Sequence, residues 1–508
     1  MAATSLADQP PQSAQPAQPP QPAQLPQLPQ VLRRLAALRA DRLPPLLLGA
    51  LEVLPVVLVS YLFVPFILEA GTLRPWNPNL VDFDVYRLGL RALFDGQGLY
   101  DVTTSYYTLS FVYPPAAALL MSPLALGTEF LWELAWTCLN SWALVVILRR
   151  CRVPRGLLLV TVAAVVTIAF EPIRSTLGYG QVNTLLLLLI LVDLLPLAPS
   201  EAAGRRLPRG LLLGIAATVK LTPLIFLVFL VLIGAKKAAA WALGTFAALN
   251  LAAAVILPQE TARFLQDLLA GQVDTFSTYA ENQAWAGVMA RWFGDSGAAG
   301  LVGWGLGGLA GLAAVIIAVT LWRRGEPVVA LGLVGLGACL AAPVGRPHHH
   351  VWALVALLGS LTTTVKVPSW ARSGLVAWST WIALCPVLVF FPHAEANTGS
   401  EKLVAALGPI GGTALLVAWA VTLWRSGALK HPWREWLKEG SWADAAPEPA
   451  ALDGAAGPAT PEPAEPAEPA EPAEPPEPTP AEPAESAPAD PAPSVTARPK
   501  RPGGAHRL

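Results

Sequence analysis

Residues 300–322 read GLVGWGLGGLAGLAAVIIAVTLW and contain no charged side chain. A helix of this length can cross the hydrocarbon core of a bilayer, which is about 30 Å thick. Comparable apolar runs recur between residues 45 and 425, and the whole chain is 54% hydrophobic but only 14% charged. A soluble domain has roughly a quarter charged residues. The sequence therefore predicts an all-α, polytopic membrane protein with its membrane domain at 45–425.

Clusters of Lys and Arg indicate which connections face the cytoplasm, because cytoplasmic loops are enriched in basic residues. They occur at 33–42, 149–155, 205–209, 236–237, 323–324, 366–372 and 425–434. About twelve crossings put every cluster on the cytoplasmic side, together with both termini. The predicted crossings are 45–68, 128–148, 156–170, 182–197, 209–219, 223–234, 238–257, 300–322, 327–342, 350–366, 371–391 and 404–424.

The remaining segments are predicted to lie outside these crossings. The run at 112–126 is short and proline-headed, so we expect an interfacial or re-entrant helix there. Residues 258–299 are expected to form a long extracytoplasmic loop. Residues 1–44 are rich in Pro and Gln, and 426–508 are rich in Pro, Ala and Glu. Neither tail has enough apolar side chains for a core, so both are predicted to be disordered and cytoplasmic.

The sequence gives no sign of a nucleic-acid partner, a metal ion or a nucleotide cofactor. The formal net charge is −1, which gives no indication of nucleic-acid binding. The four cysteines lie in or beside apolar runs and lack metal-site spacing. The adjacent histidines at 348–350 have poor geometry for one zinc ion. No glycine-rich phosphate loop occurs, so we expect neither a metal nor a nucleotide cofactor.

Polar residues gather in the connections that this topology puts outside the cell. Polar groups near membrane depth are costly, and they therefore indicate function. The set comprises Asp82, Asp84, Tyr86, Arg87, Glu171, Arg174, Gln181, Asn183, Lys220, Thr222, Glu281, Asn282, Gln283, Arg291, Arg346, His348, His349 and His350.

These side chains suit one kind of chemistry. A carboxylate can deprotonate a hydroxyl group, and Arg, Lys and His can stabilise phosphate charge. Amides and aromatic rings suit a sugar. Together at a membrane surface, they indicate transfer of a sugar from a lipid-phosphate carrier. The cell membrane, with an extracytoplasmic site, is the expected location.

Ordered sequence blocks carry a resemblance to a known family. They read DFDVYRLG at 82–89, LYD at 99–101, YPP at 113–115, EPIRSTL at 171–177, GQVN at 180–183, KLTP at 220–223, NQ at 282–283, PV at 343–344 and HH at 348–349. The set resembles the polyprenol-phosphate-mannose-dependent α-1,2-mannosyltransferases, glycosyltransferase family 87 of the GT-C superfamily. The resemblance implies a GT-C-like bundle with extracytoplasmic loop helices. It also implies a polyprenyl-phosphate sugar donor and a glycolipid or glycan acceptor.

The resemblance further implies that the first-loop aspartate is a general base in an inverting displacement. Asp82 fits the family pattern Asp-(Leu/Phe)-x-Val-Tyr, and Asp84 is the alternative. Donor phosphate is the expected ligand of Lys220 and Arg174. The histidines could bind the donor phosphate or orient the base, and His349 is preferred to His348. Helix capping or interhelical bonding is the other possible role of the amides. The expected substrate-binding residues are Tyr86, Arg87, Glu171, Arg174, Gln181, Asn183, Lys220, Asn282, Gln283, His348 and His349.

Several positions depart from the family pattern. The family usually has Ser-Pro-(Ile/Val)-Ser-Trp before its histidine pair, whereas Gly345 and Arg346 stand in place of Ser-Trp here. His350 replaces a later Trp, and Ala284 stands where Ser is usual. These changes lie in loops expected to contact substrate, so they leave the sugar and the acceptor open.

Two other functional classes fit a polytopic chain. A transporter or lipid-linked sugar flippase is favoured by the short pair 209–219 and 223–234, since transporters use discontinuous helices. No internal repeat supports that interpretation. A non-catalytic scaffold for the Pro/Ala/Glu tail would lose its function when the tail is deleted.

Overall fold

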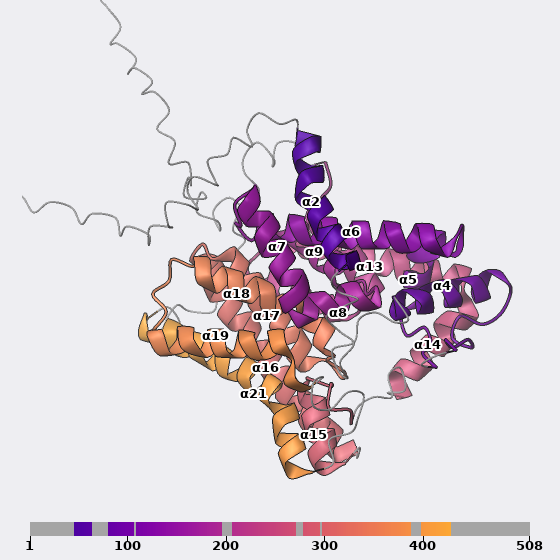
Figure 1. The fold of residues 1–508 in the computed structure, drawn as a ribbon. Coiled ribbons are helices and arrows are strands. Elements are labelled where there is room, and N and C mark those ends of the chain that lie inside the picture. The colour runs from indigo at the N-terminus through magenta and orange to yellow at the C-terminus, as the bar shows by residue number, and fades with distance from the viewer. Residues whose placement is uncertain are drawn as a thin grey trace, which may run out of the picture. The chain divides into compact units, whose positions relative to one another are not determined.

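The computed structural model describes residues 45–62, 80–105, 108–195, 206–270, 278–294, 297–387 and 398–427 (Figure 1). The tail at 1–44 and nearly all of the tail at 426–508 lie outside these residues. The prediction of disorder in the tails therefore stays a prediction.

Within the described ranges the secondary structure is helical. An isolated antiparallel bridge joins Thr103 and Ser110. The first helices are α2 (Pro45–Leu62), α4 (Val81–Phe94), α5 (Pro115–Met121), η2 (Ser122–Ala125), α6 (Glu129–Arg150), α7 (Leu157–Ala169), α8 (Glu171–Tyr179) and α9 (Asn183–Leu194). The central ones are α11 (Leu211–Val219), η3 (Thr222–Leu224), α12 (Ile225–Leu232), α13 (Lys236–Ile256), α14 (Pro258–Ala270) and α15 (Trp285–Phe293). The last are α16 (Gly297–Arg323), α17 (Pro327–Ala341), η4 (Pro347–Val351), α18 (Trp352–Thr362), α19 (Ser369–Leu384) and α21 (Gly399–Arg425).

The predicted all-α architecture is confirmed, and every predicted crossing contains a helix. By length and composition, 4 of the described helices can span a membrane alone: α6, α13, α16 and α21. A fifth span would combine α7 and α8, which are bent by 77° at Phe170. Five further stretches are apolar but shorter: Leu46–Tyr61, Pro115–Ala125, Asn183–Leu194, Thr222–Leu232 and Pro327–Ala341. The number of twelve crossings therefore stays a prediction.

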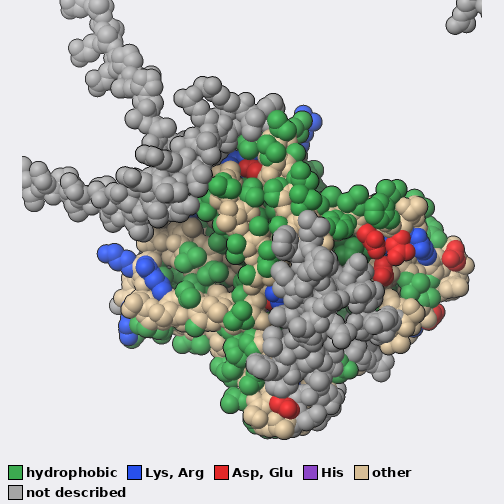
Figure 2. Space-filling view, viewed as in Figure 1, with side chains coloured by type: hydrophobic (Ala, Val, Ile, Leu, Met, Phe, Trp, Pro, Cys, Tyr) green, Lys and Arg blue, Asp and Glu red, His purple; other side chains and the backbone are tan. Residues whose placement is uncertain are grey.

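Exposed apolar side chains support contact with lipid. Leu46, Val255 and Leu269 are each more than four-fifths exposed, at 90%, 82% and 88%. Hydrophobic groups also cover much of the described surface in Figure 2. Such a surface suits a bilayer rather than water.

The loop regions of the prediction contain helices of their own. The stretch at 258–299 includes α14 and α15, and α4 precedes the run at 112–126. That run forms the short helices α5 and η2. α5 packs against α4 and α14, and the three lie close together in Figure 1.

Glycines allow α16, α17 and α18 to pack side by side (Figure 1). A Cβ atom on Gly332 of α17 would lie 2.4 Å from the backbone nitrogen of Ala356 in α18. A Cβ atom on Gly307 of α16 would lie 2.8 Å from the carbonyl oxygen of Leu340 in α17. Small residues at such contacts let helix backbones approach closely in membranes. These contacts hold α17 against α16 and α18, and the histidine connection runs between α17 and α18.

We expect Gly332→Val to destabilise the protein by about 1–3 kcal/mol, because the added methyl groups collide with the backbone of α18. Gly308→Val is the matched control, since a Cβ atom at Gly308 meets no atom within 4 Å. Thermal unfolding of both variants in detergent would measure the difference. Equal midpoints for the two variants would contradict this account of the packing.

Candidate active site

A cavity of about 810 Å³ lies where the predicted extracytoplasmic connections meet. Its polar lining comes from α4, the segment 108–114, and the connections α8–α9, α11–η3 and α17–η4. The polar side chains that matter below are Asp82, Tyr86, Tyr113, Gln181, Lys220, Arg346, His348 and His349. Residues far apart in the sequence thus come together at one cavity.

Asp82 lies in the first turn of α4 and faces the cavity. The Nε2 group of Gln181 donates a 2.8 Å hydrogen bond to its carboxylate. α4 can approach the α8–α9 turn because position 180 is glycine: a Cβ atom there would lie 2.6 Å from Phe83, and the φ of Gly180 is +66°. Only glycine adopts this conformation at no steric cost. Gly180 therefore brings the carboxylate and the amide together.

Two tyrosines fix the orientation of the Gln181 amide. The hydroxyl groups of Tyr86 and Tyr113 lie 3.2 and 3.0 Å from its Oε1 atom. They also lie 3.0 Å from each other. Because phenols donate to the amide oxygen, the amide NH₂ group must face Asp82. Tyr86 follows Asp82 by four residues and so shares its helix face.

The surroundings of Asp82 make its carboxyl group a suitable base. Removal from water raises its pKa to about 6, while the Gln181 bond and the charges of Arg346 and Lys220 act in the opposite direction. A carboxylate with a pKa near the working pH is both ionised and basic enough to accept a proton. Both its position in the cavity and its raised pKa therefore suit Asp82 to accept a proton.

Asp84 and Arg87 lie elsewhere. Asp84 does not line the cavity, and its carboxylate clusters with those of Glu129 and Glu133. Burial and these negative neighbours raise its pKa to about 7. Arg87 donates hydrogen bonds to the carbonyl oxygens of Leu124 and Gly127, at 2.8 and 3.3 Å. Asp82 and Asp84 thus face different surroundings, and Arg87 holds η2 and the turn that follows it.

The predicted residues at 171–183 also separate into some that line the cavity and some that do not. Glu171 accepts a hydrogen bond from Ser175, and Arg174 donates to the carbonyl oxygen of Ile168 at 2.9 Å. Neither lines the cavity. Asn183 donates to the carbonyl oxygen of His348 at 2.9 Å and accepts from Lys220 at 3.3 Å. It thereby joins two connections that line the cavity.

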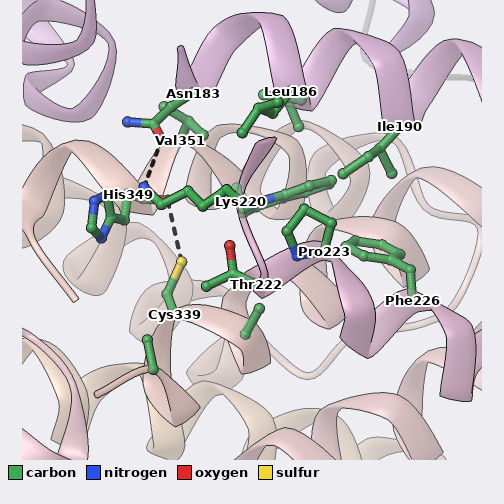
Figure 3. Close-up of a pocket in the computed structure, with 14 residues that line it drawn as sticks. Asn183, Leu186, Ile190, Lys220, Thr222, Pro223, Phe226, Cys339, His349 and Val351 are labelled. Atoms are coloured by element: carbon green, nitrogen blue, oxygen red, sulfur yellow. Dashed lines mark hydrogen bonds between the residues drawn. The ribbon is translucent and has the colours of Figure 1, made fainter. Parts of the chain in front are cut away.

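Lys220 stands between the large cavity and a smaller, mostly apolar pocket (Figure 3). Its extended backbone separates α11 from η3. The ammonium group points toward Asn183 and His349, whereas Ile190 and Phe226 lie on the apolar side. Lys220 and His349 line both spaces, so they can present positive charge and an N–H group at one boundary.

The histidines are held by the backbone of their own short helix. The Nδ1 atom of His349 accepts a 3.1 Å bond from the backbone N–H of Arg346. Burial, followed by the charge of Lys220, lowers the pKa of His349 well below its usual value. A neutral imidazole whose Nδ1 accepts carries its proton on Nε2. His349 therefore has an N–H donor, and burial lowers the pKa of His348 likewise.

Of the two predicted sugar-reading amides, Asn282 holds the histidine connection and Gln283 holds the segment before α15 against α21. Asn282 accepts from the backbone N–H of Gly345 at 2.9 Å and donates to the carbonyl oxygen of Pro343 at 3.3 Å. Gln283 donates to the carbonyl oxygens of Ala280 and Ala405, at 2.8 and 3.0 Å. Neither amide lines the cavity.

The sequence interpretation gave no specific role to several residues that complete the site. Tyr113 orients Gln181, and Arg346 lines the cavity while it pairs with Glu281 at 3.4 Å. The YPP block contains Tyr113, and the departure from the family pattern marked Arg346. Apolar lining residues from α14 and α16 had no sequence signal of this kind.

Loss of the Gln181 amide should raise the pKa of Asp82 above about 6, because its hydrogen bond stabilises the ionised form. In Gln181→Leu, we expect carbodiimide modification of Asp82, which requires the protonated acid, to persist to a pH about one unit higher. Mass spectrometry of the labelled peptide measures the midpoint. Thr222→Val, which alters the cavity without touching Asp82, is the control. An unchanged midpoint in Gln181→Leu would contradict the proposed contact.

Comparisons with known proteins identify the family of the chain. Residues 111–343 match the profile of Glycosyltransferase family 87. The chain is 35% identical over 310 residues, 56% of its length and 70% of the relative's, to a polyprenol-phosphate-mannose-dependent α-(1-2)-phosphatidylinositol mannoside mannosyltransferase of Mycobacterium tuberculosis. It is 31% identical over 407 residues, 74% of its length and 90% of the relative's, to the corresponding phosphatidylinositol pentamannoside enzyme of that species. A pentamannoside mannosyltransferase of Mycolicibacterium smegmatis is 32% identical, over 74% of this chain and 92% of its own length. No solved structure matches the chain.

Proposed function

Because the chain belongs to glycosyltransferase family 87 and is a membrane glycosyltransferase, we propose that it transfers mannose from a polyprenyl-phosphate sugar to a cell-envelope glycolipid or polysaccharide. The reaction inverts the anomeric configuration, with Asp82 as general base. The observation that carries the proposal is the convergence of Asp82, Lys220 and His349 on one cavity.

The names of the relatives support the choice of substrates. Their donor is polyprenol-phosphate mannose, and their acceptors are phosphatidylinositol mannosides. We carry both to this chain, and a phosphatidylinositol mannoside is the first acceptor to test. The cavity volume of about 810 Å³ is in the range of sites that bind small molecules.

The chemistry is a single displacement at the anomeric carbon. The acceptor oxygen forms a bond to that carbon while its proton moves to the carboxylate of Asp82. The bond between the anomeric carbon and the phosphate oxygen breaks, and its electron pair leaves with polyprenyl phosphate. A β-linked donor then gives an α-glycoside.

Lys220 and His349 act on the leaving group. The ammonium group and the Nε2–H of the neutral imidazole lie at the boundary of the cavity, where they can bind the departing phosphate. Preorganised positive charge of this kind stabilises the charge that develops in the transition state. Phosphate leaves readily once stabilised, so the reaction needs no strong general acid.

Asp82→Asn should lower kcat by about 10²–10⁴-fold, because the amide cannot accept the acceptor's proton. Asp84→Asn, on the same helix but outside the cavity, should keep its kcat within about twofold. The assay uses purified protein, polyprenyl-phosphate mannose and a phosphatidylinositol mannoside, with mass analysis of the product. Near-normal turnover by Asp82→Asn would remove the assignment of the base.

Lys220→Gln should lower kcat by about 10²-fold, the usual effect of removing one group that stabilises a developing anion. Lys220→Arg should recover part of the loss because it keeps the charge. The same assay measures both variants. If the glutamine and arginine variants had equal activity, the role of the charge at this position would be wrong.

Transport is the second candidate function. The interruption of the helix between α11 and α12 favours it, because transporters use discontinuous helices. Family membership favours transfer. Reconstituted protein distinguishes them: a transferase releases polyprenyl phosphate and extends the acceptor, whereas a flippase moves intact donor between leaflets.

A further inference from the structure

One wall of the cavity is apolar and comes from two helices outside the polar cluster. Phe264, Leu268 and Leu269 of α14 and Trp304 of α16 line the same space as Asp82 and Lys220. The proposed chemistry uses none of these four side chains.

This wall reaches the outer surface of the protein. Leu268, Leu269 and Trp304 are 40%, 88% and 52% exposed, although each also lines the cavity. Leu265 and Leu301, on the same two helices, are 49% and 68% exposed but do not line it. The cavity is open rather than enclosed, and its apolar wall adjoins exposed side chains of the same two helices. An opening framed by Leu and Trp suits a hydrocarbon chain better than a sugar in water.

Polar contacts hold α14 in position. Arg263 forms an ion pair with Asp101, and Glu260 accepts a 3.2 Å hydrogen bond from the backbone N–H of Leu99. The ring of Phe264 stacks on Tyr100 with centroids 6.3 Å apart. Several attachments thus fix the helix, while its exposed leucines border the opening.

We propose that the opening between α14 and α16 holds the isoprenoid chain of the lipid-phosphate donor. The inference rests on the proposed function and gives the chain of that donor a defined path. In such a donor the chain is joined directly to the phosphate, so it must leave the cavity close to Lys220. The reactive hydroxyl of a glycolipid acceptor is separated from its acyl chains by the headgroup, so those chains can stay outside.

Protection of introduced cysteines tests this path. Leu268→Cys and Trp304→Cys are made in a Cys138→Ser background, because the other native cysteines are buried. Leu265→Cys and Leu301→Cys are matched controls on the same helices. Each protein is reconstituted in lipid nanodiscs and labelled with a maleimide, alone or with long-chain polyprenyl monophosphate.

At a ligand concentration about ten times Kd, we expect labelling at residues 268 and 304 to slow about tenfold, with little change at 265 and 301. Equal protection of all four positions, or none, would overturn the proposal. Protection by a phosphatidylinositol mannoside but not by polyprenyl monophosphate would assign the opening to the acceptor instead. Protection by inorganic phosphate alone would also contradict a chain-binding site.

A kinetic comparison gives an independent measure. Leu268→Asp should raise KM for a long-chain donor about tenfold relative to Leu265→Asp and leave kcat similar, because only residue 268 borders the path. A donor with a chain of two isoprene units should be much less affected. Equal KM values for the two variants would contradict the proposal. Protection needs no turnover, so absence of mannose transfer would overturn the proposed function without overturning the chain path.

Discussion

The backbone at 343–350 has to satisfy its hydrogen bonds without forming a long helix, and the candidate site depends on how it does so. Asn282 binds the backbone at Gly345 and Pro343, and Asn183 binds the carbonyl oxygen of His348. Irregular backbone near membrane depth persists only when protein groups replace water in this way. These side-chain amides therefore determine where Arg346 and the histidines lie.

That constraint explains which parts of the site the sequence could predict. The blocks containing Asp82, Gln181, Lys220 and His349 were expected to meet, and all four side chains line the cavity. Asn282 and Gln283 are amides of the same kind, but Asn282 bonds to the backbone of the histidine connection and Gln283 to that of α21. A buried amide can bind a sugar or a backbone, and sequence alone does not distinguish the two.

Helix geometry explains two further differences. Asp84 and Arg87 follow Asp82 by two and five residues, which turns them away from its face of α4. Apolar runs predicted a helix within each crossing, and the breaks at Phe170 and Lys220 coincide with predicted ends of crossings. They leave α7, α11 and α12 shorter than a bilayer is thick. The apolar wall from α14 was not foreseen because 258–299 had been interpreted as a loop. The amphipathic pattern of α14 shows which face lines the cavity only when the packing of Phe264 on Tyr100 is known.

The amide of Gln181 also limits how the enzyme chooses its sugar. Its oxygen already accepts from Tyr86 and Tyr113, and its nitrogen already donates to Asp82. Rotation of this amide toward a substrate hydroxyl would break its hydrogen bonds to Tyr86, Tyr113 and Asp82. Gln181 can therefore offer a substrate at most the second N–H of its amide, in a fixed direction, while its other contacts hold it against Asp82. Selectivity among sugars must then depend mainly on other groups, whose hydrogen bonds the fold leaves open.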